Sequence, residues 1–140
     1  MSRISKDEYY LNLAKEVSRR STCLKRQYGA VIVNQDEVVA TGYNGPPRTY
    51  PHCYTCKRLQ TPSNGNNYDD CESVHAEMNA IISASRREMI GSTMYLFGFQ
   101  SGQVILGAGP CKICRRLIKN AGIKRIVSFN EKGEIKDEYI

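Results

Sequence analysis

Two short motifs, each at the expected start of a helix, constrain this chain more than any other feature. The first is His75-Ala76-Glu77, and the second is the sequence PCKIC at residues 110–114. One imidazole and two thiolates are the protein ligands that a catalytic zinc takes, with a fourth position left to water. Proline suits the first turn of a helix, and a helix N-terminus favours thiolates. We therefore expect the N-termini of two helices to meet at one zinc ion.

The expected zinc ligands are His75, Cys111 and Cys114. The two cysteines are three residues apart, so they share one face of a helical turn. Glu77 is not needed as a ligand, which leaves it free to move a proton between water and a substrate. We expect Glu77 to be the catalytic general acid and base.

The alternative is a closed structural zinc site without activity. Such a site has four ligands, in paired CxxC spacing or in CxxC with HxxxH. The two motifs supply three ligands, so they favour an open, catalytic site.

Composition bounds the class of protein. The 140 residues are 41% hydrophobic and 24% charged, which predicts a single domain over residues 1–140 with its own core. No apolar run approaches the length of a membrane span, and residues 1–8 lack the apolar stretch of a secretory signal. We expect a cytoplasmic protein without a membrane partner. In that setting its six cysteines are more easily explained as metal ligands or free thiols than as disulfides.

The formal net charge of +6 would suit an anionic partner such as a nucleotide. The basic residues are scattered, however, and no long basic run stands out. A merely solvated basic surface is the alternative.

Hydrophobic spacing predicts alternating helices and strands. A helix is expected from Ser5 to about Arg20, with Ser5 and Glu8 as a capping box. Residues 29–33 and 38–43 predict a hairpin, and residues 44–73 a long loop. The remaining expected elements are a helix over 74–87, strands over 94–99 and 103–106 forming a second hairpin, a helix over 112–120 ended by Gly122, and a last strand over 123–129. This order predicts an α/β fold, a mixed sheet covered by helices.

Six segments of the chain resemble the deoxycytidylate (dCMP) deaminase family. They are STC at 21–23, YGAVIV at 28–33, TGYNG at 41–45, HC at 52–53, VHAEMNAI at 74–81 and PCKIC at 110–114. The last two are shared by the cytidine, tRNA adenosine and guanine deaminases, so they indicate only the reaction class. TGYNG before a cysteine-rich loop indicates the nucleotide branch. The resemblance implies a three-layer α/β/α cytidine deaminase-like fold with a central mixed sheet, and hydrolysis of dCMP to dUMP and ammonia.

The resemblance also implies substrate contacts. Asn44 matches a substrate-contacting asparagine of the family, and its amide suits a sugar hydroxyl or a base edge. An ordinary turn residue is the alternative. Ala76, inside the first motif, is a further expected contact. The candidate cations for the phosphate are Lys25, Arg26 and Arg48, each of which could instead be a solvated surface charge.

Two departures from the family pattern affect specificity. Family members commonly carry arginine where this chain has Lys25, and lysine cannot form a forked contact to phosphate. They also run almost directly from the strand into PCxxC, whereas residues 99–109 intervene here. This insertion could reshape the substrate pocket or a subunit contact.

Four further cysteines, Cys23, Cys53, Cys56 and Cys71, make a full tetrahedral ligand set. Several dCMP deaminases hold a second, structural zinc through these regions, so the resemblance implies one here, with His52 able to replace a cysteine. Separate reduced thiols are the alternative.

Other functions stay open at this point. The substrate could be dCTP, CMP, a nucleoside or a base in a nucleic acid, although we do not expect a nucleic acid partner. A non-catalytic zinc module is the rival from another class, and Glu77 argues against it because a structural site has no use for that carboxylate. The resemblance also implies a homohexamer that is activated by dCTP and inhibited by dTTP near TGYNG.

Overall fold

The computed structural model describes residues 2–56, 71–107 and 109–140. Within them, one six-stranded sheet has the order β2-β1-β3-β5-β6, with β4 paired to β3. The strands are β1 (Gln27–Asn34), β2 (Glu37–Tyr43), β3 (Thr93–Gln100), β4 (Gln103–Val104), β5 (Arg125–Phe129) and β6 (Ile135–Tyr139). β3 and β5 are parallel and the other pairs antiparallel. The sheet is therefore mixed, as predicted.

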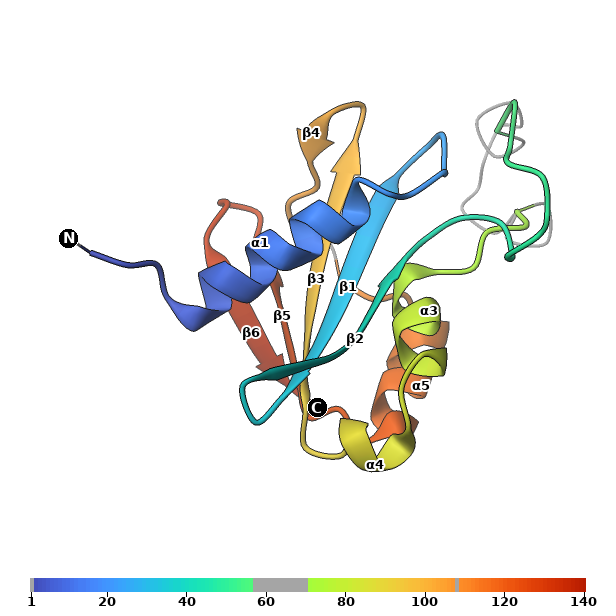
Figure 1. Ribbon diagram of the computed structural model, residues 1–140. Helices are drawn as coiled ribbons and strands as arrows, with labels where there is room; N and C mark the ends of the chain where they lie inside the picture. The colour runs from blue at the N-terminus through green and yellow to red at the C-terminus, as the bar shows by residue number, and fades with distance from the viewer. Residues whose placement is uncertain (1, 57–70, 108) are drawn as a thin grey trace.

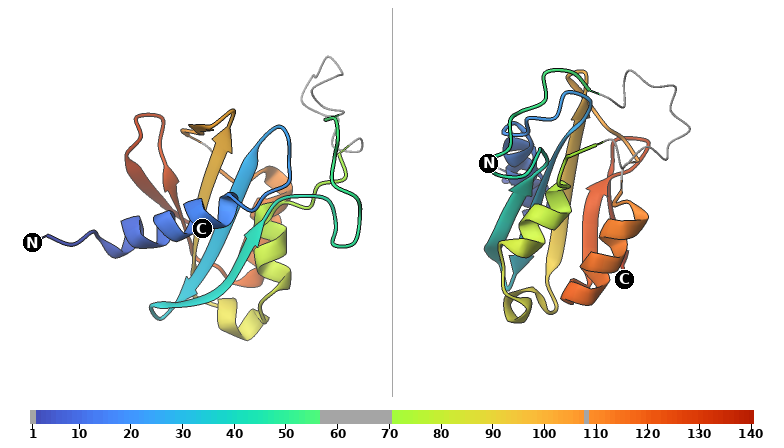
Figure 2. Two further views of the ribbon diagram at one scale, coloured as in Figure 1. Left: turned by 45° about the horizontal axis from the view of Figure 1, so that its top comes forward. Right: turned by 90° about the vertical axis from the view of Figure 1, so that its right-hand side faces the viewer.

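Helices cover both faces of this sheet. They are α1 (Lys6–Ser18), α3 (Ala76–Ile82), α4 (Arg86–Met89) and α5 (Lys112–Ala121). α1 lies across one face, and α3 and α5 lie on the other (Figures 1 and 2). Two separate apolar clusters fill the two helix–sheet interfaces. The predicted three-layer α/β/α fold is confirmed.

α1 begins at Ser5, whose side chain accepts a hydrogen bond from the Glu8 N–H at 3.1 Å. Its buried residues Tyr10, Leu11 and Ala14 recur at helical spacing and face the sheet. They pack against alternate strand residues, Val31 and Val33 of β1, Tyr95 and Phe97 of β3 and Val127 of β5.

On the opposite face α3 approaches the sheet at backbone contact distance. A Cβ added to Gly42 of β2 would lie 2.4 Å from the carbonyl oxygen of Ala76 and 2.3 Å from the nitrogen of Ala80. Both alanines are fully buried. Because Gly42, Ala76 and Ala80 are small, the backbone of α3 packs directly against the backbone of β2.

α5 brings the second motif to the same face. Cys111 is its N-cap residue, and Cys114 and Ile118 point into the core. The helix ends at Gly122, which has the left-handed conformation with φ of 90°. The glycine stop predicted for this helix is confirmed.

Two sequence-based predictions about elements were wrong. The helix expected over residues 74–87 is two helices, because α3 ends after Ile82 and Ser85 starts α4 with a capping box to Glu88. The strand at 125–129 is also not the last one, since β6 follows it. β6 has mostly polar residues and lies at the sheet edge, so it lacks the apolar pattern of a buried strand.

The long loop is tied together at its two ends. Gly45 and Val74 exchange backbone hydrogen bonds, with N···O distances of 3.2 and 2.7 Å. Residues 44–56 and 71–73, on the described part of this loop, form no helix or strand beyond this bridge. Residues 57–70 lie outside the described residues. Among the helices of the described residues, none has the length and apolar character needed to cross a membrane.

Candidate active site

The three predicted zinc ligands meet between α3 and α5. His75 is the N-cap residue of α3, Cys111 is that of α5, and Cys114 lies in the first turn of α5. His75 Nδ1 lies 3.2 Å from Cys114 Sγ and 3.6 Å from Cys111 Sγ. Among the described residues, this is the cluster whose three ligand atoms all lie within 4.8 Å of one another.

These separations fit a zinc ion. With zinc bonded to nitrogen at about 2.0 Å and to sulfur at about 2.3 Å, tetrahedral geometry places the two ligand atoms about 3.5 Å apart. The two nitrogen–sulfur distances lie on either side of this value. An imidazole with two thiols is also the ligand set that zinc prefers. The two helix N-termini therefore form a three-ligand site with room for a fourth ligand.

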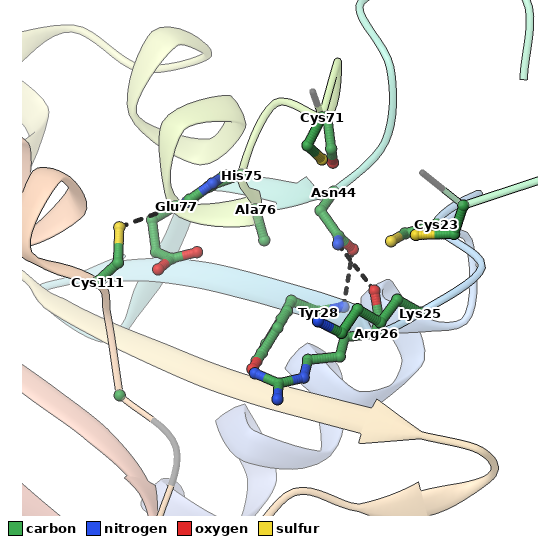
Figure 3. A pocket seen from close by; sticks show the side chains of 13 residues that line it. Cys23, Lys25, Arg26, Tyr28, Asn44, Cys71, His75, Ala76, Glu77 and Cys111 are labelled. Carbon is green, nitrogen blue, oxygen red and sulfur yellow. Dashed lines mark hydrogen bonds between the residues drawn. The ribbon is translucent and has the colours of Figure 1, made fainter. Parts of the chain in front are cut away.

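Glu77 lies beside this cluster, in the first turn of α3. Its side chain points into the same pocket as His75 and Cys111 (Figure 3), yet the residue is only 6% exposed. Burial raises the pKa of the Glu77 carboxyl, and the nearby backbone and His75 oppose this shift. A carboxyl with a raised pKa is suited to accept and return a proton near neutral pH.

Cys114 is the buried cysteine of the cluster, whereas Cys111 is only partly buried. Cys114 is fully buried, and burial together with the neighbouring Glu77 carboxylate raises the pKa of its thiol. The helix N-terminus acts in the opposite direction, because it favours the thiolate. A bound metal ion would reverse the balance because its charge stabilises the thiolate.

The pocket next to the cluster has a volume of about 280 Å³. Ala76 and Glu77 line its metal-binding end, and Lys25, Arg26 and Asn44 line it further out. Five of the six residues predicted for substrate chemistry are thus brought together. The sixth, Arg48, does not line this pocket. It lines a separate cavity of about 420 Å³, together with Tyr43 and Gly45.

Asn44 links the two segments that form the outer pocket. It is 7% exposed, and its Oδ1 accepts from Ser21 Oγ at 2.6 Å and from the Tyr28 N–H at 2.8 Å. Its Nδ2 donates to the Arg26 carbonyl at 2.9 Å (Figure 3). The predicted substrate contact therefore also holds the main chain of residues 21–28, and one N–H of its amide is left to face a ligand.

Tyr28 is a pocket residue that sequence reasoning missed. Its ring lines the pocket, and its hydroxyl lies against the Arg26 guanidinium (Figure 3). Burial raises the pKa of the Tyr28 hydroxyl, and the charge of Arg26 opposes this shift. No local pattern marks this residue, since its position depends on the pairing of β1 with β3.

The four remaining cysteines gather beside the pocket. Cys23, Cys53, Cys56 and Cys71 line one cavity of about 190 Å³, together with His52. Burial raises the pKa of the Cys53 thiol, as do the nearby Cys23 and Cys71. All four are free thiols, and their sulfur atoms do not form a cluster as tight as the first site.

The chain is similar to known zinc-binding deaminases. The family model described as the cytidine and deoxycytidylate deaminase zinc-binding region matches residues 4–130. A deoxycytidylate deaminase of Mycobacterium phage D29 is 38% identical, with 91% of this chain and 96% of that protein covered. The deoxycytidylate deaminase of Schizosaccharomyces pombe is 37% identical over 89% of this chain, which spans 37% of the yeast protein.

Solved structures share the fold. A dCMP deaminase from the cyanophage S-TIM5, in complex with dCMP and dUMP, superimposes with a TM-score of 0.66 at 24% identity. The match covers 91% of this chain and 85% of the cyanophage chain. With the family model matching residues 4–130, the chain belongs to the cytidine and deoxycytidylate deaminase family.

Proposed function

We propose that this chain hydrolyses dCMP to dUMP and ammonia. The observation that carries the proposal is the open His75, Cys111 and Cys114 cluster with the buried Glu77 carboxyl beside it. The phage relative, which this chain matches over 96% of its length, is named for this activity. The pocket volume of about 280 Å³ is compatible with a small ligand.

In this proposal His75, Cys111 and Cys114 hold zinc, which when bound acidifies water and so supplies a nucleophile at neutral pH. Glu77 accepts a proton from the attacking water and delivers it to N3 of the cytosine ring. The water oxygen bonds to C4. Glu77 then takes the second proton from the new C4 hydroxyl and passes it to the amine, so that the C4–N4 bond breaks, ammonia leaves and C4 becomes a carbonyl. Ala76 lines the space for the ring, and Asn44 offers its remaining N–H to the sugar.

The test follows ammonia release from dCMP, CMP, deoxycytidine, dCTP and a cytosine-containing single strand, with zinc-loaded protein. The Glu77→Gln variant should bind zinc and fold normally but lose at least about 100-fold in kcat, the lower range for acid–base catalysis. Glu16→Gln, an exposed residue of α1, is the matched control. Loss of zinc from Glu77→Gln would mean that Glu77 is a ligand. Turnover of another substrate would change the specificity and keep the chemistry.

Two alternatives predict different results. A polynucleotide deaminase would act on the single strand, and a non-catalytic zinc module would release no ammonia from any of the five compounds. The pocket residues favour a small nucleotide, because the cations among them are few and lie beside the substrate space.

A second, structural zinc is the finer part of the cofactor proposal. The shared cavity of Cys23, Cys53, Cys56 and Cys71 supports it, with His52 as a possible substitute ligand. Metal analysis of active protein should give two zinc ions per chain, and one ion for Cys53→Ser. A single zinc ion in fully active wild-type protein would contradict this proposal.

Effector binding is a further proposal, which the resemblance suggests and the cavity of about 420 Å³ supports. Arg20 and Arg48 line that cavity with Tyr43, a combination suited to phosphates and a base. Asn79 also lines this cavity, and its Nδ2 donates to the Tyr43 carbonyl at 2.8 Å. Asn79 lies on α3, the helix that carries Glu77, so it connects the cavity to the catalytic helix.

We expect dCTP to raise the rate and dTTP to lower it, and Arg48→Ala to weaken both responses. Rates that are flat in both triphosphates would contradict this. The homohexamer is a prediction that sedimentation at several concentrations tests, and the cytoplasmic location is likewise a prediction.

A further inference from the structure

The β3–β4 hairpin, whose tip belongs to the insertion at residues 99–109, contacts residues that line the substrate pocket. Phe99 pairs with Val104, and the Ile105 N–H donates to the Gly98 carbonyl at 2.9 Å. On its other side β3 pairs with the start of β1, where Tyr28 lies opposite Gly98. The hairpin therefore lies directly alongside the strand end that supplies the outer pocket.

The Tyr28 ring packs directly against the backbone of Gly98. A Cβ added at Gly98 would lie 2.5 Å from Cε1 and 2.7 Å from Cδ1 of Tyr28. It would also lie 3.2 Å from Cδ1 of Ile105, which comes from the returning arm of the hairpin. The ring therefore rests against the bare backbone of β3, and no larger residue at position 98 would leave it there.

Arg26 is held at both ends. Its carbonyl accepts from Asn44 Nδ2 at 2.9 Å, and its Nε donates to Gln100 Oε1 at 3.1 Å. Gln100 is the last residue of β3, so this contact exists because the strand extends into the hairpin. A guanidinium has five N–H donors, and the bond to Gln100 uses the one on Nε. The two terminal nitrogens keep the forked geometry that binds phosphate.

We propose that the β3–β4 hairpin positions the phosphate-binding groups of this pocket, with Gln100 orienting the Arg26 guanidinium and Gly98 accommodating the ring that carries the Tyr28 hydroxyl. The proposal rests on the proposed function, which fixes the base at the metal-binding end. The phosphate then extends toward the outer pocket, where Lys25 and Arg26 are the lysine and arginine among the described lining residues.

Arg26 is the better phosphate ligand of this pair on the chain's own geometry. Lys25 is a point charge on a flexible stem, whereas the hydrogen bond from Arg26 Nε to Gln100 restricts the positions of the Arg26 fork. The Tyr28 hydroxyl next to it adds a neutral donor. A nucleoside without phosphate would gain nothing from either group.

The first test compares Gln100→Ala with Gln103→Ala, which removes the same amide from the opposite position of the same hairpin. Loss of the Arg26–Gln100 contact should raise KM for dCMP about three- to tenfold, in line with one hydrogen bond, and leave kcat unchanged. Gln103→Ala should match wild type in both constants.

The second test measures binding without turnover. Calorimetry gives the affinity for dUMP and for deoxyuridine, which differ only by the phosphate. Tyr28→Phe keeps the ring on Gly98 and removes the hydroxyl, so it should weaken dUMP binding about threefold or more and leave deoxyuridine binding unchanged. Tyr139→Phe, at an exposed position in β6, is the matched control.

The outcomes separate this proposal from the proposed function. If wild type releases no ammonia from dCMP, the proposed function fails, and the calorimetric comparison still decides the phosphate contact. Gln100→Ala and Tyr28→Phe behaving like their controls would overturn the positioning role while deamination stands. Equal weakening of dUMP and deoxyuridine binding would also overturn it, because that result indicates a general effect on the fold.

Discussion

Asn44 combines a structural role and a proposed binding role in one side chain. Three of its hydrogen bonds go to residues of the segment 21–28, on the other side of the pocket mouth. The amide is nearly fully buried, so each bond is made away from bulk water. A residue that looks like a turn former from local sequence thus fixes the shape of the pocket.

Replacing Asn44 by Ala should therefore reduce stability as well as activity. The Tyr28 N–H and the Arg26 carbonyl would lose their partner, at a cost of about 2–4 kcal/mol in the free energy of unfolding. Urea unfolding measures this change. Asn79→Ala, which removes one exposed amide contact from α3, should cost less than about 1 kcal/mol. A stable but inactive Asn44→Ala protein would show that the side chain acts on the substrate alone.

At the scale of elements, a charged cluster ties α1 to the sheet. Arg125 of β5 donates to both carboxylate oxygens of Asp7, at 3.0 and 2.7 Å, and Tyr95 of β3 donates to Asp7 at 2.7 Å. Arg125 also donates to Asp137 of β6 at 2.9 Å. The side chains of Asp7 and Arg125 are 30% and 19% exposed, so this forked pair is partly withdrawn from water.

The Asp7 cluster makes the stability of the fold depend on pH. The hydrogen bonds from Arg125 hold the pKa of the Asp7 carboxyl below its usual value. This stabilisation is complete above the unfolded pKa of about 3.9 and disappears as the pH falls through the folded value.

Asp7→Asn should lower the free energy of unfolding by about 1.5–3 kcal/mol at neutral pH, and by progressively less below about pH 4. Urea titrations across this pH range test the prediction, with the exposed Glu16→Gln as control. A difference that is independent of pH would rule out the carboxylate as its source.

Some elements of this fold could be predicted from the sequence, and others could not. The hairpin of β1 and β2 and the ends of α1 and α5 could be predicted because apolar spacing, caps and turn residues are local. The division of the 74–87 helix was missed although its signal is local, since Ser85 and Glu88 have the spacing of a capping box. Tyr28 as a pocket residue, and Gln100 as the partner of Arg26, were missed because their contacts cross from β1 to β3.

At the scale of the whole molecule, the proposed zinc ion joins two segments that are far apart in the chain. His75 starts α3 and Cys111 starts α5, and β3 with its hairpin lies between them in sequence. The site could be predicted from its two motifs, but the burial that raises the pKa of Cys114 could not, since it follows from how α5 packs on the sheet.

Removal of zinc should destabilise the whole domain. A ligand present at 1,000 times its Kd contributes about 4 kcal/mol, which for a chain of this size corresponds to a fall in Tm of about 10 °C on chelation. Calorimetry with and without chelator tests this. In a Cys53→Ser background, which removes the proposed second zinc, the further change Cys114→Ser should give a low Tm that chelator changes little. An unchanged wild-type Tm would contradict a zinc site that joins the two helices.

The contact between Gly42 and α3 limits which substitutions the chain can tolerate at this position. A methyl group there would have to move the helix that carries Glu77, although Gly42 itself does not line the pocket beside the metal cluster. A saturation library scored for activity would therefore reject changes at Gly42 as strictly as changes at Glu77. Residues of the outer pocket can therefore change one at a time, whereas the contact between β2 and α3 can change only if Gly42 and the facing residues of α3 change together.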